Sequence, residues 1–446
     1  MTMHTKHAAC AAALLAVVFA LAAGAARADD WPQFRGPGGD GVAAAADPPL
    51  AWDESRGVLW KVATPGRGRS SPVVLGDRIW LTTAYETPDT PENARRRLEG
   101  LPDAGDLEVC ASVRLGVLCL DRATGKILYE REVLRVDQPQ QVHKMNSFAT
   151  PTPVVEPGRV YCDFGAMGTV CVDAATGDVV WQQRLPIDHL VGPGSSPVLY
   201  KNLLLLVRDG CDAQFIAALD TKTGQVAWKT DRPPLQTRGD LKKAYSTPLI
   251  IEAAGRTQAI IPGAQWVVSY DPASGKELWR VHHGTGFSLA PRPVYGDGLV
   301  YISTGCVVAR LLAIRVDGQG DVTGTHVAWK ATENIPVLSS PLLVGKALYT
   351  VSDSGKVTCF DARTGEVQWQ ARAKGTHLAS PVYAGGRLYF FSREGRTTVF
   401  GPGAPPEPLA ENVLDGVVSA TPAFVGRAIL LRTDTHLYCL GAAAAP

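Results

Sequence analysis

The sequence lacks several features that would each point to a different class of protein. Its charges nearly cancel, because 44 lysines and arginines meet 43 aspartates and glutamates, for a formal net charge of +1. That balance offers no overall electrostatic attraction to nucleic acid. After the N-terminal segment, no apolar run is long enough to span a membrane. The nine cysteines include no adjacent pair, no CxxCH haem signature and no zinc-site spacing.

Long amphipathic helical patterns are also missing, and one ten-residue phrase recurs in their place. It consists of Asp, two variable residues, Thr or Ser, Gly, and an aromatic residue four positions after the Gly. The copies are LDRATGKILY (120–129), VDAATGDVVW (172–181), LDTKTGQVAW (219–228), YDPASGKELW (270–279) and FDARTGEVQW (360–369). Asp can close a turn on nearby backbone groups, and Gly accepts a positive φ. Each phrase therefore predicts a strand, a tight hairpin and a strand, with the Asp forming the turn rather than acting as a catalytic acid.

The spacing of the phrase predicts the fold. Successive phrase glycines lie 52, 47, 51 and 90 residues apart, and the longest gap holds a degenerate copy that ends at Trp329. A second marker, a small residue before Pro at the start of an apolar run, gives the count. The eight markers are Ser71-Pro72, Thr152-Pro153, Ser196-Pro197, Thr247-Pro248, Ala290-Pro291, Ser340-Pro341, Ser380-Pro381 and Thr421-Pro422. A period of this length with several strands indicates an all-β, eight-bladed β-propeller.

The two ends of the repeat region predict how the ring closes. The eighth unit stops at HLYCLG (436–441), where its outer strand should follow. The stretch GVLWKVATPG (57–66) precedes the first unit and carries Trp60 at the aromatic position. We expect this N-terminal strand to complete the last blade, which places the propeller at residues 57–441 and leaves no exposed sheet edge.

The remaining segments carry three further expectations. Residues 1–28 are predicted to be a signal peptide that ends in small residues at Ala28, so the protein would be exported, to the periplasm or outside the cell, and soluble. Loss of Lys6 and Arg27 would change the net charge from +1 to −1. Residues 29–56 form an N-terminal extension and residues 442–446 a tail. An insertion at 86–112 in the first blade carries a helix capped by Thr90; we interpret it as a solvated loop, with a lid over one face as the alternative.

The cysteines after the signal peptide have a packing interpretation. Four of them stand just before the last apolar residue of the third strand of their repeat, where the other repeats have Ala218, Ser269, Ala313 and Val399; they are Cys119, Cys171, Cys359 and Cys439. Cysteine serves at such a position as a small apolar residue. One disulfide stays open, because a four-residue turn in CDFGAMGTVC would place Cys162 opposite Cys171.

The repeat carries a family resemblance. It resembles the repeat of quinoprotein (PQQ) dehydrogenases and of the outer-membrane assembly factor BamB. The stretches DDWPQFRGPGGDG (29–41), HKMNSFATPTP (143–153) and GDVTGTHVAWK (320–330) resemble a narrower set, the exported PQQ-binding-like β-propeller proteins of planctomycetes and similar bacteria. The resemblance implies the fold and leaves the activity open.

Two main functions therefore remain. The resemblance to quinoprotein dehydrogenases implies PQQ, a ring formed by two adjacent cysteines, a calcium ion and an Asp base. The adjacent cysteines are missing and no calcium ligand set can be placed, so a PQQ-dependent oxidoreductase is the alternative, and a purely structural envelope component is a third possibility. We expect an exported, non-catalytic, monomeric scaffold without a catalytic residue, cofactor or metal ion, whose partner is an envelope protein, a glycan or a small molecule.

The binding hypothesis places the site in the loops before the proline markers, which should rim one mouth of the central channel. These loops contain Arg67, Arg69, Lys144, Asn146, Ser147, His189, Lys242, Tyr245, His283, Asn334 and His377. We expect a polar, mildly basic funnel. The ligand-binding candidates are Lys144, Asn146, Ser147, Arg69, Lys242 and Tyr245. The structural alternative is that Asn146 and Ser147 only satisfy backbone groups of a tight loop.

Overall fold

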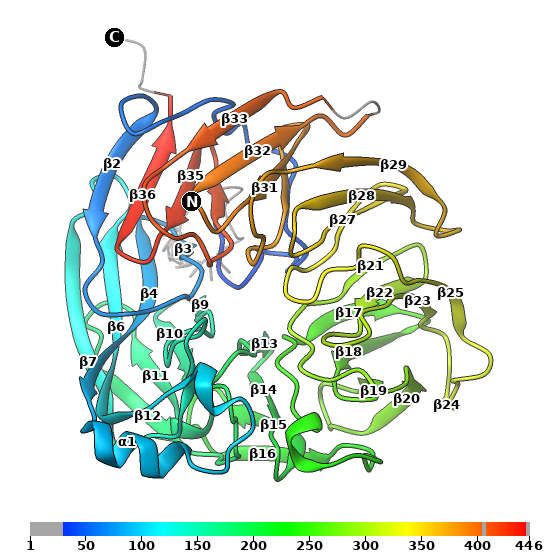
Figure 1. Ribbon diagram of the computed structural model, residues 1–446, viewed down its shortest axis with the longest axis horizontal. Helices are drawn as coiled ribbons and strands as arrows, with labels where there is room; N and C mark the ends of the chain where they lie inside the picture. The colour runs from blue at the N-terminus through cyan, green and yellow to red at the C-terminus, as the bar shows by residue number, and fades with distance from the viewer. Residues whose placement is uncertain (1–29, 404–406, 443–446) are drawn as a thin grey trace, which may run out of the picture.

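The computed structural model describes residues 30–403 and 407–442 and shows eight sheets around one axis (Figure 1). The predicted eight-bladed propeller is confirmed. The expected signal peptide lies outside the described residues. Within them, no helix has the length and apolar character needed to cross a membrane.

Blades 1 to 4 follow one another along the chain, each with its innermost strand first. Blade 1 consists of β3 (Val73–Leu75), β4 (Arg78–Pro88), β6 (Cys110–Asp121) and β7 (Ile127–Asp137). Blade 2 consists of β9 (Val154–Glu156), β10 (Arg159–Asp163), β11 (Thr169–Asp173) and β12 (Val179–Gln183). Blade 3 consists of β13 (Val198–Tyr200), β14 (Leu203–Asp209), β15 (Gln214–Asp220) and β16 (Val226–Asp231). Blade 4 consists of β17 (Leu249–Ala253), β18 (Arg256–Pro262), β19 (Trp266–Tyr270), β20 (Glu277–His282) and a short fifth strand, β24 (Gly320–Asp321).

Blades 5 to 8 complete the ring. Blade 5 consists of β21 (Val294–Gly296), β22 (Leu299–Ser303), β23 (Leu311–Arg315) and β25 (Val327–Ala331). Blade 6 consists of β26 (Leu342–Val344), β27 (Ala347–Val351), β28 (Lys356–Asp361) and β29 (Val367–Arg372). Blade 7 consists of β30 (Val382–Ala384), β31 (Arg387–Phe391), β32 (Arg396–Phe400) and β33 (Ala410–Val413), with β1 (Val42–Ala43) added parallel to β30. Blade 8 consists of β34 (Ala423–Val425), β35 (Ala428–Arg432), β36 (His436–Gly441) and β2 (Val58–Ala63).

The closure prediction is confirmed by blade 8. Strand β2 lies beside β36 in Figure 1 and pairs antiparallel with it. Trp60 lies opposite Cys439. The last blade thus receives its outer strand from the N-terminal side of the chain, which satisfies the outer edge of β36.

The recurring phrase is explained by contacts between neighbouring blades. In four copies the indole of one blade packs on the turn glycine of the next, where an added Cβ would come within 2.4 to 2.6 Å of the ring: Trp60 on Gly125, Trp181 on Gly224, Trp228 on Gly275 and Trp329 on Gly365. Each Nε1 donates to a carbonyl of the same turn at 2.9 to 3.2 Å. The glycines have φ between +71° and +77°. The phrase is therefore a docking element of the ring, and Gly is required both by φ and by the indole.

The aromatic residue of the fourth strand also explains why the third strand has a small residue at one position. This small residue lies directly opposite the aromatic residue of the fourth strand in seven pairs: Cys119 with Tyr129, Cys171 with Trp181, Ala218 with Trp228, Ser269 with Trp279, Ala313 with Trp329, Cys359 with Trp369, and Cys439 with Trp60. A small side chain leaves room for the large ring beside it.

The geometry proposed for a Cys162–Cys171 disulfide is wrong by one residue. Cys171 pairs with Tyr161, and Cys162 pairs with Val170. A shift of one residue turns a strand side chain to the other face. Accordingly, Cys162 packs toward blade 1 and Cys171 toward blade 3, and both thiols are free.

Two further boundaries differ from the prediction. The β4–β6 pairing extends to Pro88 and Cys110, so the insertion of blade 1 covers 89–109 rather than 86–112. It holds α1 (Pro91–Leu98), a 3-10 turn (Ala104–Asp106) and β5 (Leu107–Glu108), with Thr90 capping α1 as expected. Strand β5 pairs with β8 (Val142–His143), so the insertion is tied to the mouth of the channel rather than free in solvent.

The marker of blade 5 was also misplaced by two residues. Strand β21 begins at Val294, so the residue before the strand-opening proline is Arg292, not Ala290. The second pair in APRP is therefore the equivalent of Ser340-Pro341 in blade 6, where β26 begins at Leu342. The sequence pattern did not reveal this position, because an arginine precedes the strand-opening proline here, whereas Ser or Thr precedes it in every other blade.

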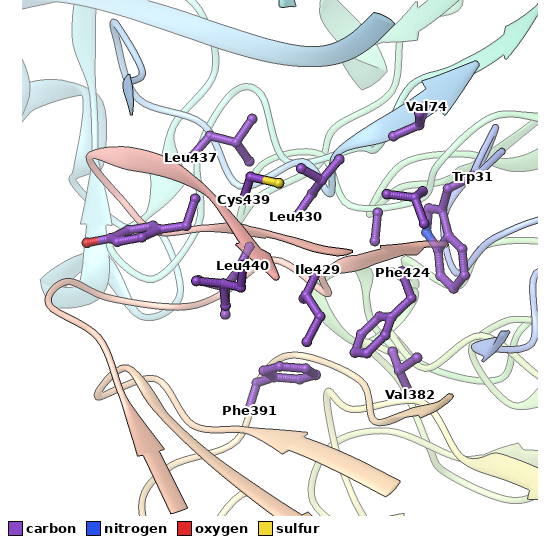
Figure 2. Close-up of a cluster of buried hydrophobic side chains, with 14 of the residues drawn as sticks. Trp31, Val74, Val382, Phe391, Phe424, Ile429, Leu430, Leu437, Cys439 and Leu440 are labelled. Carbon is purple, nitrogen blue, oxygen red and sulfur yellow. The ribbon is translucent and has the colours of Figure 1, made fainter. Parts of the chain in front are cut away.

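The N-terminal extension contributes to the core at the closing point of the ring. Trp31 packs against Phe424 of blade 8 and pairs with Val74 of blade 1. Figure 2 shows Trp31 beside Phe424 and Val74, next to Val382 and Ile429. Large buried aromatics of this kind stabilise a core through area burial and ring contacts, so the extension is part of the propeller and not a linker.

Candidate functional site

The described residues enclose a cavity of about 590 Å³ on the propeller axis, at the end where each blade is entered. We call it the channel cavity. Its wall comes from the connections that lead into the innermost strands of the blades, as the rim prediction proposed. Cavities of this size accommodate small ligands or a few residues of a peptide.

A girdle of hydroxyl groups surrounds the channel cavity. At six of the eight blade junctions, the backbone N–H of the residue before the strand-opening proline donates to the hydroxyl of the equivalent residue in the next blade, at 2.9 to 3.0 Å. The six bonds run from Ser71 to Thr152, Thr152 to Ser196, Ser196 to Thr247, Arg292 to Ser340, Ser340 to Ser380, and Ser380 to Thr421. The proline marker is thus architectural: Pro fixes the strand start, and Ser or Thr links one blade to the next.

The N-terminal extension closes the inner end of the channel. Phe34 forms part of the cavity floor. Its carbonyl accepts a hydrogen bond of 2.6 Å from Nη1 of Arg292, whose Nε donates to the carbonyl of Pro248 at 3.0 Å. Arg35 crosses to blade 6, where its Nη2 donates to the carbonyl of Pro341 at 2.8 Å. Both arginines are buried, and together they hold the segment across the channel, which makes the channel cavity a blind funnel.

A glycine of the extension makes this closure possible. A Cβ on Gly39 would come within 2.3 Å of Nη1 of Arg292, and its φ is +67°. The run GPGGDG therefore allows the backbone to approach a buried guanidinium closely, which no larger residue could do at this point.

The wall of the channel cavity is mostly apolar. Among its charged groups, Lys243 is buried, donates from Nζ to the carbonyl of Asp240 at 2.6 Å and lies over the ring of Phe287 at 5.2 Å. Burial raises the pKa of Asp353, which also lines the wall. The hydroxyl of Tyr245 donates to the carbonyl of His189 at 2.8 Å. The wall thus combines apolar surface with a hydroxyl ring and few charges, which differs from the polar, basic funnel that we expected.

The predicted candidates fall into two groups. Arg69, Asn146 and Tyr245 line the channel cavity, whereas Lys144, Ser147 and Lys242 do not. Their role in ligand binding stays a prediction. Lys243, the neighbour of Lys242, is the lysine of this pair that lines the cavity.

The loop 143–148 shows the bonds that the structural alternative predicts. Nδ2 of Asn146 donates to the carbonyls of Val191 and Pro193 at 2.9 and 3.1 Å, and its Oδ1 accepts from Ser147 N at 2.9 Å. Ser147 is fully buried. Lys144 donates from Nζ to the carbonyl of Gly105 in the insertion at 2.5 Å. These side chains fix the loop and the insertion at the mouth; Asn146 does so from the cavity wall, and Lys144 and Ser147 from outside it.

Three rim histidines are buried in the connections and hold backbone groups. Nε2 of His189 accepts from Ala166 N at 3.0 Å, and Nε2 of His283 and His377 lie 2.9 and 3.3 Å from the carbonyls of Gly263 and Ala373. Burial lowers the pKa of His189 to about 3 and that of His283 to about 4, and it also lowers the pKa of His377. Among the described residues, no three His, Cys, Asp or Glu side chains are grouped to hold a metal ion.

Comparison with known families and curated proteins gives the following matches. The family described as "Outer membrane protein assembly factor BamB" matches residues 114–261 and 263–401, more than half of the chain. A quinohemoprotein alcohol dehydrogenase, ADH-IIG of Pseudomonas putida, is 27% identical over 169 residues, which cover 33% of this chain and 23% of that protein. Tetrathionate hydrolase of Acidithiobacillus ferrooxidans is 21% identical over 262 residues, 56% of this chain and 47% of that protein. The chain spans less than half the length of either curated relative.

Solved structures share the architecture. BamB from Moraxella catarrhalis superposes with a TM-score of 0.54 at 14% identity, over 85% of this chain and 100% of that one. Quinohemoprotein alcohol dehydrogenase from Comamonas testosteroni superposes with a TM-score of 0.61 at 11% identity, over 95% of this chain and 82% of that one. At such identities the likeness concerns the fold, which scaffolds and enzymes share.

Proposed function

This chain belongs to the family described as outer membrane protein assembly factor BamB, and from that membership we propose that it is an exported, non-catalytic scaffold that binds a ligand in its channel mouth. The ligand is an extended segment of a partner protein, a glycan or a small molecule. The observation that carries the proposal is the channel cavity of about 590 Å³, lined by the variable connections that lead into the blades.

The construction of the cavity supports binding. Phe34 of the N-terminal extension lines the cavity, and the extension is held across the channel by Arg292 and Arg35. The cavity wall is held by interblade hydrogen bonds, and a wall that is already in place reduces the entropy lost when a ligand is bound. Apolar surface gives affinity, while the girdle hydroxyls and Lys243 offer a small number of directed polar contacts.

The wall does not fit the PQQ and calcium arrangement that the quinoprotein resemblance implies. Cys306 is the cysteine in the wall, so no cysteine pair can form a ring there. Its carboxylates are Asp103 and Asp353, which come from blades 1 and 6 and have no third metal-binding partner grouped with them among the described residues. We therefore propose that the scaffold functions without PQQ.

The proposal is tested by filling the cavity. Ala290 lines the wall and is partly exposed, so Ala290→Trp should occupy the space without disturbing the blades. Val179 lies on the outer strand β12 and is 45% exposed, which makes Val179→Trp a matched control on the outer wall. Each variant is immobilised, and its capture of envelope proteins and of an arrayed glycan set is measured.

We expect Ala290→Trp to lose capture of its specific partner by roughly tenfold or more, which corresponds to about 1.4 kcal/mol, while Val179→Trp captures like the wild type. Equal capture by both variants at equal melting temperature would contradict a channel site. Incubation with PQQ and Ca²⁺, followed by a visible spectrum and a dye-linked alcohol assay, tests the alternative: stoichiometric binding with turnover would replace the scaffold proposal by an oxidoreductase.

A further inference from the structure

A second cavity, of about 300 Å³, lies beside the channel mouth between blades 7, 8 and 1. We call it the arginine pocket. Four arginines stand in its wall, and they come from two connections and one strand end: Arg67 and Arg69 before β3, Arg393 after β31, and Arg432 at the end of β35. Arg69 also lines the channel cavity, so the two spaces share a wall. No sequence motif brings these arginines together.

The charges in the arginine pocket are not balanced. Arg67 is paired with Glu86 at 3.3 Å and with Glu108 at 2.9 Å. In the part of the chain that the structure describes, the other three arginines have no carboxylate within ion-pair distance. The carboxylate of the wall is Asp434, whose Oδ1 accepts from Val417 N at 2.9 Å. Three guanidinium groups therefore face one carboxylate.

Arg432 is the most buried of the four, with 2% of its surface exposed. It donates through Nη1, to the carbonyl and hydroxyl of Ser70 at 3.2 and 2.7 Å and to the carbonyl of Thr82 at 3.1 Å. Its Nε is buried and meets no acceptor among the described residues. Burial without a counter-charge lowers the pKa of Arg432 to about 9. A Cβ on the neighbouring Gly68 would lie 2.5 Å from Nη2, so that glycine keeps space open beside the guanidinium.

The other two arginines are held close to each other. Nε of Arg393 is buried and also lacks an acceptor among the described residues, and its Nη1 lies 3.9 Å from Sδ of Met145. Nη1 of Arg69 donates to the carbonyl of Met145 and, at 3.3 Å, to the hydroxyl of Ser419. Burial and the repulsion of Arg67 and Arg393 lower the pKa of Arg69 to about 10. Like charges held this close favour an anion between them.

Two other buried arginines, Arg208 and Arg292, are satisfied differently, whereas Arg35 also keeps Nε and Nη1 without an acceptor among the described residues. Arg208 is equally buried, but its guanidinium is paired with Asp163 at 2.6 Å. Arg292 lacks a carboxylate, yet its three nitrogens donate to Pro248, Phe34 and Gln33. Buried charges that serve only the fold are usually satisfied in this way. Arg69, Arg393 and Arg432 instead line an open cavity without a carboxylate in ion-pair distance among the described residues.

We propose that the arginine pocket binds the oxyanion of a small ligand, a phosphate or sulfate group, between Arg69, Arg393 and Arg432. Guanidinium groups bind such oxygens through short, charge-assisted and often paired hydrogen bonds. The bound oxygens accept from the guanidinium groups that line the cavity and offset the excess of positive charge. The inference goes beyond the scaffold function and does not require an occupant in the channel cavity.

The test measures binding of sodium sulfate and sodium phosphate to the purified full chain, by calorimetry and by thermal shift at constant ionic strength set with sodium chloride. Arg393→Gln is the informative variant, because Arg393 is partly exposed and its side chain donates to no oxygen of the residues that the structure describes. Arg114→Gln is the matched control: Arg114 lies on blade 1 in a surface pair with Glu132. Arg432→Gln removes the charge of the most buried arginine. If that variant does not fold, Arg432→Lys keeps the positive charge and removes the planar, bidentate guanidinium group.

We expect saturable binding by the wild type and by Arg114→Gln, and an affinity roughly tenfold lower or worse for Arg393→Gln, since a hydrogen bond to a charged group is worth about 1.5–3 kcal/mol. Hexose 6-phosphate and a sulfated hexose distinguish an ester from the free ion as the better ligand. Ala290→Trp should bind sulfate normally, which separates this site from the channel site. A non-saturating rise in melting temperature that is the same in all variants would overturn the proposal.

Discussion

The two ends of the propeller are built by different rules. At the end of the turns between third and fourth strands, the same contact recurs: an indole packs on a glycine of the next blade and donates to its turn. At the other end, only the Ser or Thr before the proline recurs, and the connections differ in length and content. The repeated end fixes the ring, and therefore the variable end can carry recognition without affecting closure.

Blade 5 shows what happens when a contact of the repeated end is missing. Trp279 belongs to blade 4, and the turn on which it would dock is the degenerate copy of the phrase in blade 5. Nε1 of Trp279 donates instead to Oε1 of Gln258 at 2.7 Å. Blade 5 also carries Arg292 before its strand-opening proline, where the other blades have Ser or Thr. The backbone N–H of Arg292 still donates to the hydroxyl of Ser340. Blade 5 is thus the irregular point at both ends, and it is also the blade that anchors the floor of the channel.

The largest effect should come from deleting the residues up to Gly66. The ring then loses its closing strand β2, and the channel loses the extension that crosses it. This deletion removes β2 and also Trp31 and Trp52, which are buried; loss of one buried Trp alone costs about 3–5 kcal/mol. We expect aggregation or a melting temperature lower by roughly 10 °C or more, measured by circular dichroism and size-exclusion chromatography. Leu59→Lys, on the exposed face of β2, should behave like the wild type. An unchanged melting temperature of the truncated chain would contradict closure by β2.

The second prediction concerns how the free energy of unfolding depends on pH through two buried histidines of the variable end. His189 and His283 are neutral in the folded protein, with pKa values lowered from 6.5 to about 3 and about 4. Their contribution is fully present above pH 6.5 and is lost as the pH falls toward 4, because the unfolded chain takes up the protons first. The loss should reach about 3 kcal/mol per histidine by pH 4.

Denaturant unfolding at several pH values measures this loss. His189→Gln keeps an acceptor for Ala166 N but does not titrate, so its stability should depend less on pH between 6.5 and 4 than that of the wild type. His436→Gln, at the surface, is the control. An identical pH slope for the wild type and His189→Gln would show that the buried histidine does not control acid stability.

The third effect isolates the docking of the indole. Gly224 and Gly255 both have φ of +72°, but a Cβ on Gly224 would lie 2.6 Å from the ring of Trp181, whereas Gly255 has open space. Gly255→Ala should cost about 1 kcal/mol for the left-handed backbone, and Gly224→Ala about 2 kcal/mol more because the indole must move. Chemical denaturation of both variants gives the difference. Equal losses would mean that docking on glycine does not stabilise the ring.

The smallest effect concerns the Asp of the phrase. Hydrogen bonds from Thr176 N and Ala175 N lower the pKa of Asp173 below its usual 3.8. Its contribution is present above that value and is lost as the pH falls through the folded pKa. Asp173→Asn keeps the turn acceptor without a titrating group. We expect a slightly smaller drop in melting temperature between pH 5 and about pH 3; a drop equal to that of the wild type would contradict a role for the charge.

Most of the ring could be predicted from sequence because its rules are local. The phrase needed only the turn preference of Asp, the positive φ of Gly365 and its equivalents, and strand alternation. Cys162 and Cys171 show the limit even here: one misplaced residue in a turn reversed the face of the strand and suggested a disulfide that the register forbids. Blade 5 was misplaced for a similar reason, since Arg292 does not look like the serine that it replaces.

The candidate site was harder to predict, because its residues meet only through the whole ring. Lys242 and Lys243 are neighbours in an irregular connection, where no periodicity tells which one faces the axis. Arg69, Arg393 and Arg432 of the arginine pocket lie far apart along the chain, and no sequence motif marks Arg432 as part of a site.

The sequence by itself determined the number of blades, the closing strand and the role of the repeated phrase, since each of these depends on contacts within one unit or between adjacent ones. Only the tertiary structure decided that the N-terminal extension closes one end of the channel and that unrelated connections form two cavities at the other. Those features depend on the curvature of the complete ring, which brings Phe34 to Arg292 and Arg69 to Arg432. Short-range preferences of the chain carry no information about such distant meetings.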